Sequence, residues 1–237
     1  MSFKIFFIRL HKWAALVIGI QMLLWVAGGL VMSLFELDEV HGDLTKAAIE
    51  PKPLHWGRLV AMDSIVGQVS APIAELAVSA GFFGPQVQLT DTSGAVYRFD
   101  AQTGEPLGAI DAVQALEIAE ANYSGDGAGR IPIRVVQNST EHRGRLPVWK
   151  VDFDDGAATT LYVAVDNGEV VTRRNRIWRI YDFAWMLHIM DYRERTDFNH
   201  PLLVWASALA LLVALSGLYL IGVTPWRDEA RRLVKRK

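Results

Sequence analysis

Two long runs without a charged residue dominate the hydrophobic pattern of the chain. They extend from Trp13 to Phe35 and from Pro201 to Val223, and each contains 23 residues. A helix rises about 1.5 Å per residue, so each run would be ~34 Å long, enough to cross the apolar core of a bilayer. The pattern predicts two transmembrane helices, over 13–35 and 201–223. The first run exceeds the roughly 7–15 apolar residues of a signal peptide, and we interpret it as an uncleaved anchor.

Between these two runs, the apolar positions recur with the shorter spacings of strands and amphipathic helices. Two stretches alternate apolar with polar positions, as half-buried strands do: Trp149, Val151 and Phe153, then Leu161, Val163 and Val165. Asp155-Gly156 and Asn167-Gly168 are tight-turn signals. Upstream, Ala112 to Tyr123 has helical spacing, and Asp111 is a candidate N-cap.

An earlier stretch repeats this order of elements. It predicts a helix over Gly57 to Val69, strands at Val87–Leu89 and Val96–Phe99, and a turn at Thr103-Gly104. We therefore expect two units of a helix plus an antiparallel hairpin, over 54–108 and 109–172. The predicted fold class is α+β, with two transmembrane helices flanking a domain made of these units.

Charge sets the expected orientation. Residues 1–12 carry three basic groups and no acidic one, and the tail 224–237 carries six basic groups against two acidic ones. The positive-inside rule then places both termini in the cytoplasm and residues 36–200 outside, the periplasm for a bacterial inner membrane. Within that stretch, 36–53 is a predicted linker and 173–200 a predicted amphipathic interfacial helix with its own linker. The chain has no cysteine, so this domain does not use disulfides.

The helix followed by "WKVDFDDG…LYVAVDNGEVV" resembles the PepSY domain, a helix packed on an antiparallel hairpin sheet. The flanks "RLHKWAALVIG" and "LHIMDYRERTDFNHPLLVW…LSGLYL" resemble the PepSY-associated transmembrane family. Larger members have four spans, and some are similar to ferrisiderophore reductases that carry b-type haem between helices on histidine ligands. This chain has only two predicted spans. The resemblance implies electron transfer through haem b.

Three histidines are candidate haem-binding residues: His11 and His188 as axial ligands of the iron, and His200 next in line. His11 begins the first run, with Ala15 and Gly19 on the same helix face. His188 lies on a predicted apolar helical stripe with Ala184, and His200 precedes Pro201. Each histidine also has a structural interpretation: His11 as an interfacial side chain, His188 as a core residue with its hydrogen bonds made within the protein, and His200 as a helix cap.

The expected positions of these histidines constrain the mechanism. By the helix rise, His11 would lie about 30 Å from His188 and His200, so one metal cannot use both ends and two haem levels are expected. A bis-histidine haem at the cytoplasmic end would need His11 from two chains. A stripe of small residues could form that homodimer, or could pack the two helices of one chain: Ala206, Ala210, Ala214 and Gly217.

The other polar features have plainer interpretations. His41, His55 and His142 are expected at the surface, and the cluster Asp152, Asp154 and Asp155 is expected to be solvated on a turn. A basic run is expected to be a solvated face or to contact lipid headgroups, and could instead attract an anionic iron chelate: Arg173, Arg174, Arg176 and Arg179. The sequence contains no HExxH, GxSxG, P-loop or dinucleotide-binding motif, and the acidic balance of 36–200 argues against nucleic-acid binding.

Two functions from different classes follow. In the first, a membrane electron-transfer subunit holds haem b and reduces a periplasmic acceptor such as a ferric siderophore. In the second, a non-catalytic anchored module binds or inhibits a partner protein, for example a peptidase or an assembly partner.

Overall fold

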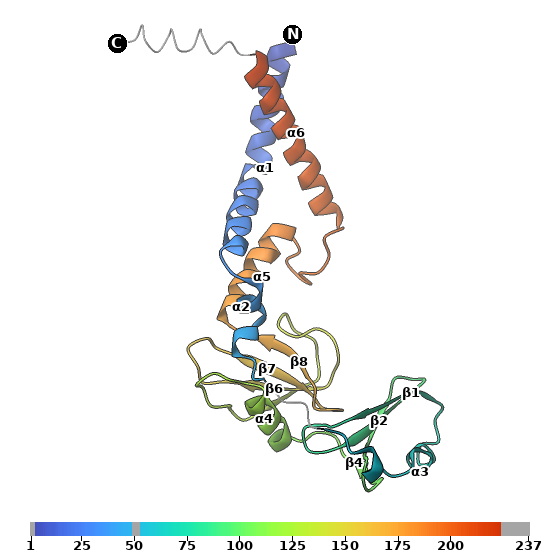
Figure 1. Cartoon of the computed structure of the whole chain (residues 1–237). Coiled ribbons are helices and arrows are strands. Elements are labelled where there is room, and N and C mark those ends of the chain that lie inside the picture. The colour runs from blue at the N-terminus through green and yellow to red at the C-terminus, as the bar shows by residue number, and fades with distance from the viewer. Residues whose placement is uncertain (1–2, 49–52, 224–237) are drawn as a thin grey trace. The chain divides into compact units, whose positions relative to one another are not determined.

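The computed structural model describes residues 3–48 and 53–223, and the predicted basic tail 224–237 lies outside the described residues. The chain has a mixed α+β fold, with two long apolar helices toward its ends and two antiparallel sheets between them (Figure 1). It divides into two compact units. We call residues 1–35 and 180–237 the helical unit, and residues 36–179 the central domain.

Helices α1 (Phe3–Ser33) and α6 (Pro201–Val223) are the two predicted apolar helices. The predicted bounds of α6 are confirmed. Helix α1 begins ten residues before the predicted Trp13, because Arg9 and Lys12 are good helix formers and do not interrupt it. Both helices are long and apolar enough to cross a membrane, over Ile5–Ser33 and Pro201–Gly222.

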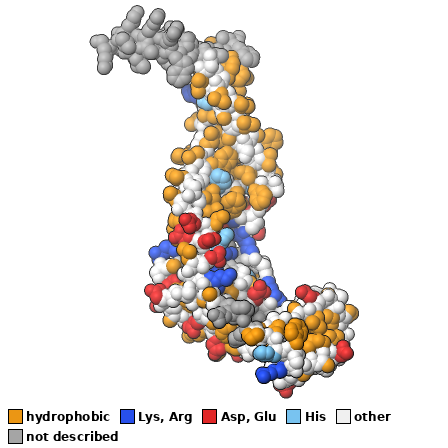
Figure 2. Space-filling model, viewed as in Figure 1, with side chains coloured by type: hydrophobic (Ala, Val, Ile, Leu, Met, Phe, Trp, Pro, Cys, Tyr) orange, Lys and Arg blue, Asp and Glu red, His pale blue; other side chains and the backbone are white. Residues whose placement is uncertain are grey.

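The apolar side chains of these helices point mostly outward. Figure 2 shows them covering the surface of the helical unit, and the large exposed ones include Leu16, Val17, Ile20, Trp205 and Leu218. A core helix of a soluble protein would bury such residues, whereas a helix in lipid exposes them. The exposure therefore favours a membrane setting for α1 and α6.

Helices α1 and α6 lie side by side and antiparallel (Figure 1). Their contact is built from small and branched residues, with Ala14 and Ile18 of α1 packed against Ala206 and Val213 of α6. The predicted small-residue stripe is thus used within one chain, since Ala206 is buried here and Gly217 faces α1. Only Ala214 of that stripe is exposed.

Helix α5 (Arg176–Ile189) begins in the central domain and ends in the helical unit. Its last residues pack against α1: Gln21 Nε2 donates to the Leu187 carbonyl at 3.0 Å, and Trp25 Nε1 donates to the His188 carbonyl at 2.6 Å. We expected an interfacial helix within 173–200. Helix α5 lies within this segment, and its end lies beside the apolar part of α1, where Gln21 satisfies one of its terminal carbonyls.

Residues 190–200 form the connection from α5 to α6. The carboxylate of Asp191 organises this loop by accepting backbone N–H groups of Arg193, Glu194, Thr196 and Asp197. Desolvation raises the pKa of Asp191, but these four hydrogen bonds outweigh it and lower the pKa to about 2. The loop is further held by Arg195, which pairs with Asp182 of α5.

The central domain opens with the short helices α2 (Leu37–His41) and η1 (Asp43–Thr45). Next come η2 (Trp56–Arg58), α3 (Met62–Val66) and a sheet in the order β1-β2-β3-β4. These strands are β1 (Ile73–Ser79), β2 (Gln86–Asp91), β3 (Val96–Asp100) and β4 (Pro106–Leu107). Ile65, Val87, Leu89 and Phe99 form its core.

The predicted helix over 57–69 is wrong for its first half. Val60 donates its backbone N–H to the Ala101 carbonyl at 3.0 Å, so this residue is tied to the sheet and the helix begins only at Met62. The strand β1 was not predicted. The sharp turn at Gly104, where φ is +75°, is confirmed.

A second sheet has the sequential order β5-β6-β7-β8 and is preceded by helix α4 (Ala112–Ala121). Its strands are β5 (Ile133–Val135), β6 (Val148–Asp152), β7 (Thr160–Ala164) and β8 (Val170–Arg174). The predicted N-cap is confirmed, since Asp111 and Gln114 form a complete capping box. Helix α4 covers one face of the sheet (Figure 1), with Ala115 and Ile118 in a core with Leu161 and Val163.

Strand β7 is buried along its whole length, although its sequence predicted one solvent-exposed face. The second face is covered by the loop of residues 136–147, which we call the His142 loop. His142 is only 1% exposed, stacks on Tyr162 with ring centroids 4.9 Å apart, and bonds Thr172 and the Arg145 carbonyl. The prediction that His142 is a surface residue is therefore wrong. His41 and His55 are exposed, as predicted.

Candidate functional site

His11 is held by its Nδ1 atom between α1 and α6. This nitrogen lies 3.1 Å from the Val213 carbonyl oxygen and 2.9 Å from Ser216 Oγ. A carbonyl only accepts, and the Ser216 hydroxyl is itself directed at the same carbonyl, at 2.9 Å. The neutral tautomer that satisfies this contact therefore carries its hydrogen on Nδ1 and its lone pair on Nε2.

The other side of the His11 ring is open. Its Nε2 has no hydrogen-bond partner among the described residues and is not enclosed. Gly217 makes room for the ring, because a Cβ at this position would lie 3.2 Å from His11 Cε1. A histidine that ligates a metal through one nitrogen almost always donates its other N–H to a carbonyl or carboxylate. His11 has this arrangement.

His188 has a different environment near the end of α5. Its Nδ1 is buried and has no hydrogen-bond partner among the described residues. Gly28 of α1 lies against it, since a Cβ at Gly28 would be 3.2 Å from the Ala184 carbonyl oxygen and 3.9 Å from His188 Nδ1. An unpaired buried nitrogen costs roughly 1–3 kcal/mol, which marks this ring as incompletely satisfied by the chain itself.

His200 uses both ring nitrogens within the chain. Its Nε2 lies 2.9 Å from the Ile189 carbonyl oxygen, and its Nδ1 accepts from the Leu203 N–H at 3.4 Å. The second bond caps the start of α6, which is the structural alternative we considered for this residue. His200 would have to give up one of these bonds to ligate a metal, and we leave it out of the ligand set proposed below.

The structure keeps His11 and His188 at separate levels of α1. His11 lies in the third turn of this helix, while Gly28, which contacts His188, is 17 positions later in the same helix. Seventeen residues of helix extend over about 25 Å. No group of three or more His, Cys, Asp or Glu residues able to hold a metal ion occurs among residues 3–48 and 53–223.

In the central domain, most of the predicted basic run is engaged in the fold. Arg179 Nε pairs with Glu141 at 2.6 Å, Arg174 Nε donates to the Glu141 carbonyl at 2.7 Å, and Arg173 donates to the Asn122 carbonyl at 2.9 Å. Burial raises the pKa of Glu141, but Arg179 outweighs this and the net shift is downward. Three of the four arginines thus stabilise the domain, contrary to the solvated face that we expected.

The carboxylates near the β6–β7 turn have separate structural partners. Asp155 accepts from the Tyr123 hydroxyl at 2.7 Å and from Thr159 Oγ1 at 2.5 Å, whereas Asp154 pairs with Arg130 at the surface. Burial and the bond to Asp155 raise the pKa of Tyr123 to about 12. The prediction of a solvated cluster holds for exposed Asp154 and is wrong for Asp155.

Comparison with protein-family models, curated proteins and solved structures finds no match for this chain. The resemblance to PepSY proteins therefore rests on the sequence motifs quoted above.

Sequence reasoning missed the partners of the candidate histidines. Ser216 is separated from His11 by 205 positions, and Trp25 is separated from His188 by 163 positions. One signal was present: Gln21 is a strongly polar amide in the middle of the first apolar run. In lipid such a side chain needs a partner, so a third element beside α1 could have been inferred.

Proposed function

We propose that this chain is a membrane-anchored PepSY protein and a b-type haem electron-transfer subunit. In this proposal α1 and α6 cross the inner membrane with both termini in the cytoplasm, and the central domain lies in the periplasm. Electrons move outward to an acceptor such as a ferric siderophore. The outward-facing apolar surface of both helices supports the membrane setting.

The orientation of His11 is the observation that carries this proposal. The contacts with Val213 and Ser216 favour the neutral tautomer with its hydrogen on Nδ1, and Gly217 leaves space beside the ring. The free Nε2 then has the lone pair and the preset direction that an axial ligand needs. Ordinary interfacial histidines need neither a fixed tautomer nor a glycine against the ring.

His188 is the proposed ligand at the second level. Gln21 and Trp25 bind the last carbonyls of α5 and hold its end against α1, so the ring is positioned by contacts from another helix. Bound haem would supply one-electron transfer at its iron, and the chain would set ring orientation and exclude water. Two levels about 25 Å apart along α1 suit stepwise transfer across a bilayer.

Each level offers one proposed histidine from a single chain, so a second copy or a membrane partner would supply the opposite ligand. The small-residue stripe of α6 is mostly covered by α1. A homodimer would therefore use other parts of the helical unit, whose outward faces are rich in large apolar side chains.

A reduced-minus-oxidised visible spectrum tests the proposal. The full chain is expressed with ample haem supply, purified in detergent and reduced with dithionite. We expect a sharp low-spin b-type α band that is lost or strongly weakened in His11→Ala and kept in His55→Ala, an exposed histidine of the central domain. Ser216→Ala should keep the band but shift the reduction potential, because the ring loses a hydrogen bond that sets its basicity.

A folded, haem-replete but colourless preparation would exclude haem binding by the isolated chain. The second candidate function, a non-catalytic anchored module that binds or inhibits a partner protein, would then lead.

A further inference from the structure

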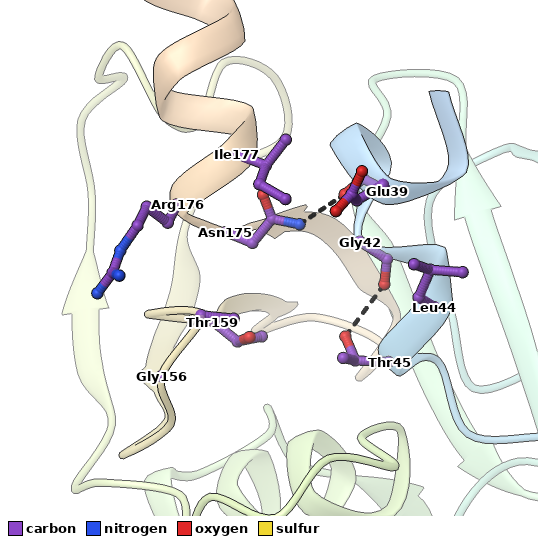
Figure 3. Close-up of a pocket in the computed structure, with 10 residues that line it drawn as sticks. Glu39, Gly42, Leu44, Thr45, Gly156, Thr159, Asn175, Arg176 and Ile177 are labelled. Atoms are coloured by element: carbon purple, nitrogen blue, oxygen red, sulfur yellow. Dashed lines mark hydrogen bonds between the residues drawn. The ribbon is translucent and has the colours of Figure 1, made fainter. Parts of the chain in front are cut away.

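The central domain contains a cavity of about 340 Å³ at the start of α5. It is bounded by the α2–η1 segment, the turn between β6 and β7, and the first turn of α5 (Figure 3). Leu44, Ala157 and Ile177 supply apolar lining, and Gly156 leaves one wall without a side chain. We call this the α2–α5 cavity.

The uncharged polar side chains in the lining already have hydrogen-bond partners. Asn175 Nδ2 donates to the Glu39 carbonyl at 2.7 Å, and its Oδ1 accepts from the Trp178 N–H at 2.6 Å. Thr45 Oγ1 donates to the Gly42 carbonyl, as Figure 3 shows, and Thr159 Oγ1 donates to Asp155. A guest in the cavity therefore finds few unpaired hydrogen-bonding groups, and an apolar guest fits it best.

Two charged side chains of the lining, those of Arg176 and Glu39, have no hydrogen-bond or ion-pair partner among the described residues. The Arg176 side chain is exposed and makes no hydrogen bond or ion pair with another described residue. Figure 3 shows it extending outward at one side of the cavity. By contrast, the neighbouring side chains of Arg173 and Arg179 form a hydrogen bond and an ion pair within the domain. Figure 3 shows Glu39 on the opposite side of the cavity from Arg176, so an anionic headgroup beside the guanidinium would lie away from the Glu39 carboxylate. An apolar cavity with this arrangement fits an amphiphile whose anionic head lies at Arg176.

Only a short stretch of the chain separates the end of α1 from the first residue that lines the cavity. This helix ends at Ser33, and the first lining residue is Glu39. Six residues extend over at most about 20 Å, so lipid at the end of α1 lies within reach of the cavity. Leu44, which lines the cavity, is 70% exposed and gives it an apolar entrance.

We propose that the α2–α5 cavity takes one acyl chain of an anionic phospholipid from the bilayer, with Arg176 on the headgroup phosphate. This goes beyond haem binding and does not depend on it, although it rests on the membrane setting of the proposed function. A single arginine beside an anionic headgroup supports a preference of about five-fold over a zwitterionic lipid.

Photolabelling of the full chain tests the proposal. The protein is reconstituted in phosphatidylcholine vesicles with phosphatidylglycerol, a trace of which carries a diazirine in its acyl chain. After irradiation, labelled peptides are mapped by mass spectrometry. We expect label on the cavity segments 42–45 and 156–159, and about five-fold less from diazirine phosphatidylcholine. Peptides of α6 should be labelled by both lipids and report correct insertion.

Two variants with matched controls separate the cavity from the surface. Gly156→Leu adds a large side chain to the cavity lining at a position where a Cβ meets no atom within 4 Å, and it should abolish label on 42–45. Gly57→Leu, an equally open site outside the cavity, should not. Arg176→Gln should remove the preference for phosphatidylglycerol, whereas Arg58→Gln, at another exposed arginine, should keep it.

Absence of label on both cavity segments while α6 is labelled would overturn the proposal. So would equal labelling of 42–45 in Gly156→Leu and the unchanged protein. Labelling of the cavity by a free diazirine fatty acid but not by the phospholipid would overturn the bilayer as the source.

Discussion

The first and second sheets of the central domain have the same sequential strand order and are each preceded by a helix, yet they are enclosed to different extents. In the first, β2 alternates buried with half-buried positions, and the preceding helix has only five residues. In the second, all of β7 is buried, because α4 covers one face and the His142 loop covers the other. The same topology thus supports a one-sided core in one case and a two-sided core in the other.

The difference arises from the connections rather than from the strands. Residues 80–85 join β1 to β2 in the first sheet, whereas the longer His142 loop joins β5 to β6 in the second. Only the longer connection reaches back over the sheet, where Glu141 binds Arg179 and His142 stacks on Tyr162. The entropic cost of closing a loop grows only slowly with its length, so a longer connection can enclose a sheet at a small cost in free energy.

The largest expected effect comes from truncating the two central leucines. Leu161→Ala in β7 and Leu89→Ala in β2 each remove a side chain that is 0% exposed. Each should destabilise its own sheet by about 3 kcal/mol. The loss should be larger for Leu161→Ala, because a strand enclosed on both faces cannot relax into the void that the missing side chain leaves. Hydrogen–deuterium exchange of the full chain, read peptide by peptide, measures both losses. If Leu89→Ala loosened β7 as much as β2, the two sheets would be one cooperative unit and the comparison would fail.

A smaller destabilisation is expected from a change in the His142 loop, which covers the second sheet. His142→Ala removes two hydrogen bonds and the ring that stacks on Tyr162, and it should cost about 2 kcal/mol. Faster exchange should be confined to β7, β8 and the His142 loop. The matched control His55→Ala, at an exposed site, should stay within about 0.5 kcal/mol. Unchanged protection of β7 in His142→Ala would show that the loop does not stabilise the strand.

The smallest expected effect tests the two helices. Asp111→Ala removes the capping box of α4 and should cost about 1 kcal/mol. Helix α3 has Ala61 at its N-cap and no side-chain cap, so Ala61→Asp should stabilise it by up to about 1 kcal/mol. Opening free energies of the two helices from the same exchange measurement should converge in the double variant. A further weakening of α3 would show that its start does not admit a cap.

Local features of the fold were predictable wherever neighbouring residues determine them. Asp111 and Gln114 are three positions apart and form a capping box on their own. Gly168 adopts a φ of +77°, as its place in an Asn-Gly turn predicts. Strand β5 escaped prediction because it has only three residues, and β1 because its apolar and polar positions do not alternate cleanly.

The candidate site was predictable only in part. The sequence singled out His11 and His188 with His200 next in line, but it could not give the structural reason for this order. Their rank depends on hydrogen bonds from other elements: Val213 and Ser216 orient His11, while Ile189 and Leu203 occupy His200. Such partners lie on separate helices, and no periodicity within one helix reports them.

The sequence alone determined that two apolar helices of membrane length lie toward the ends of the chain and that strands and turns lie between them. These properties follow from periodicity and from local backbone preferences. The tertiary structure alone decided that His142 is buried, that Arg176 is free while Arg173 and Arg179 are bound, and that one nitrogen of His11 is left open. Burial and hydrogen bonding of a side chain depend on what packs against it, and here that is chain tens to hundreds of residues away.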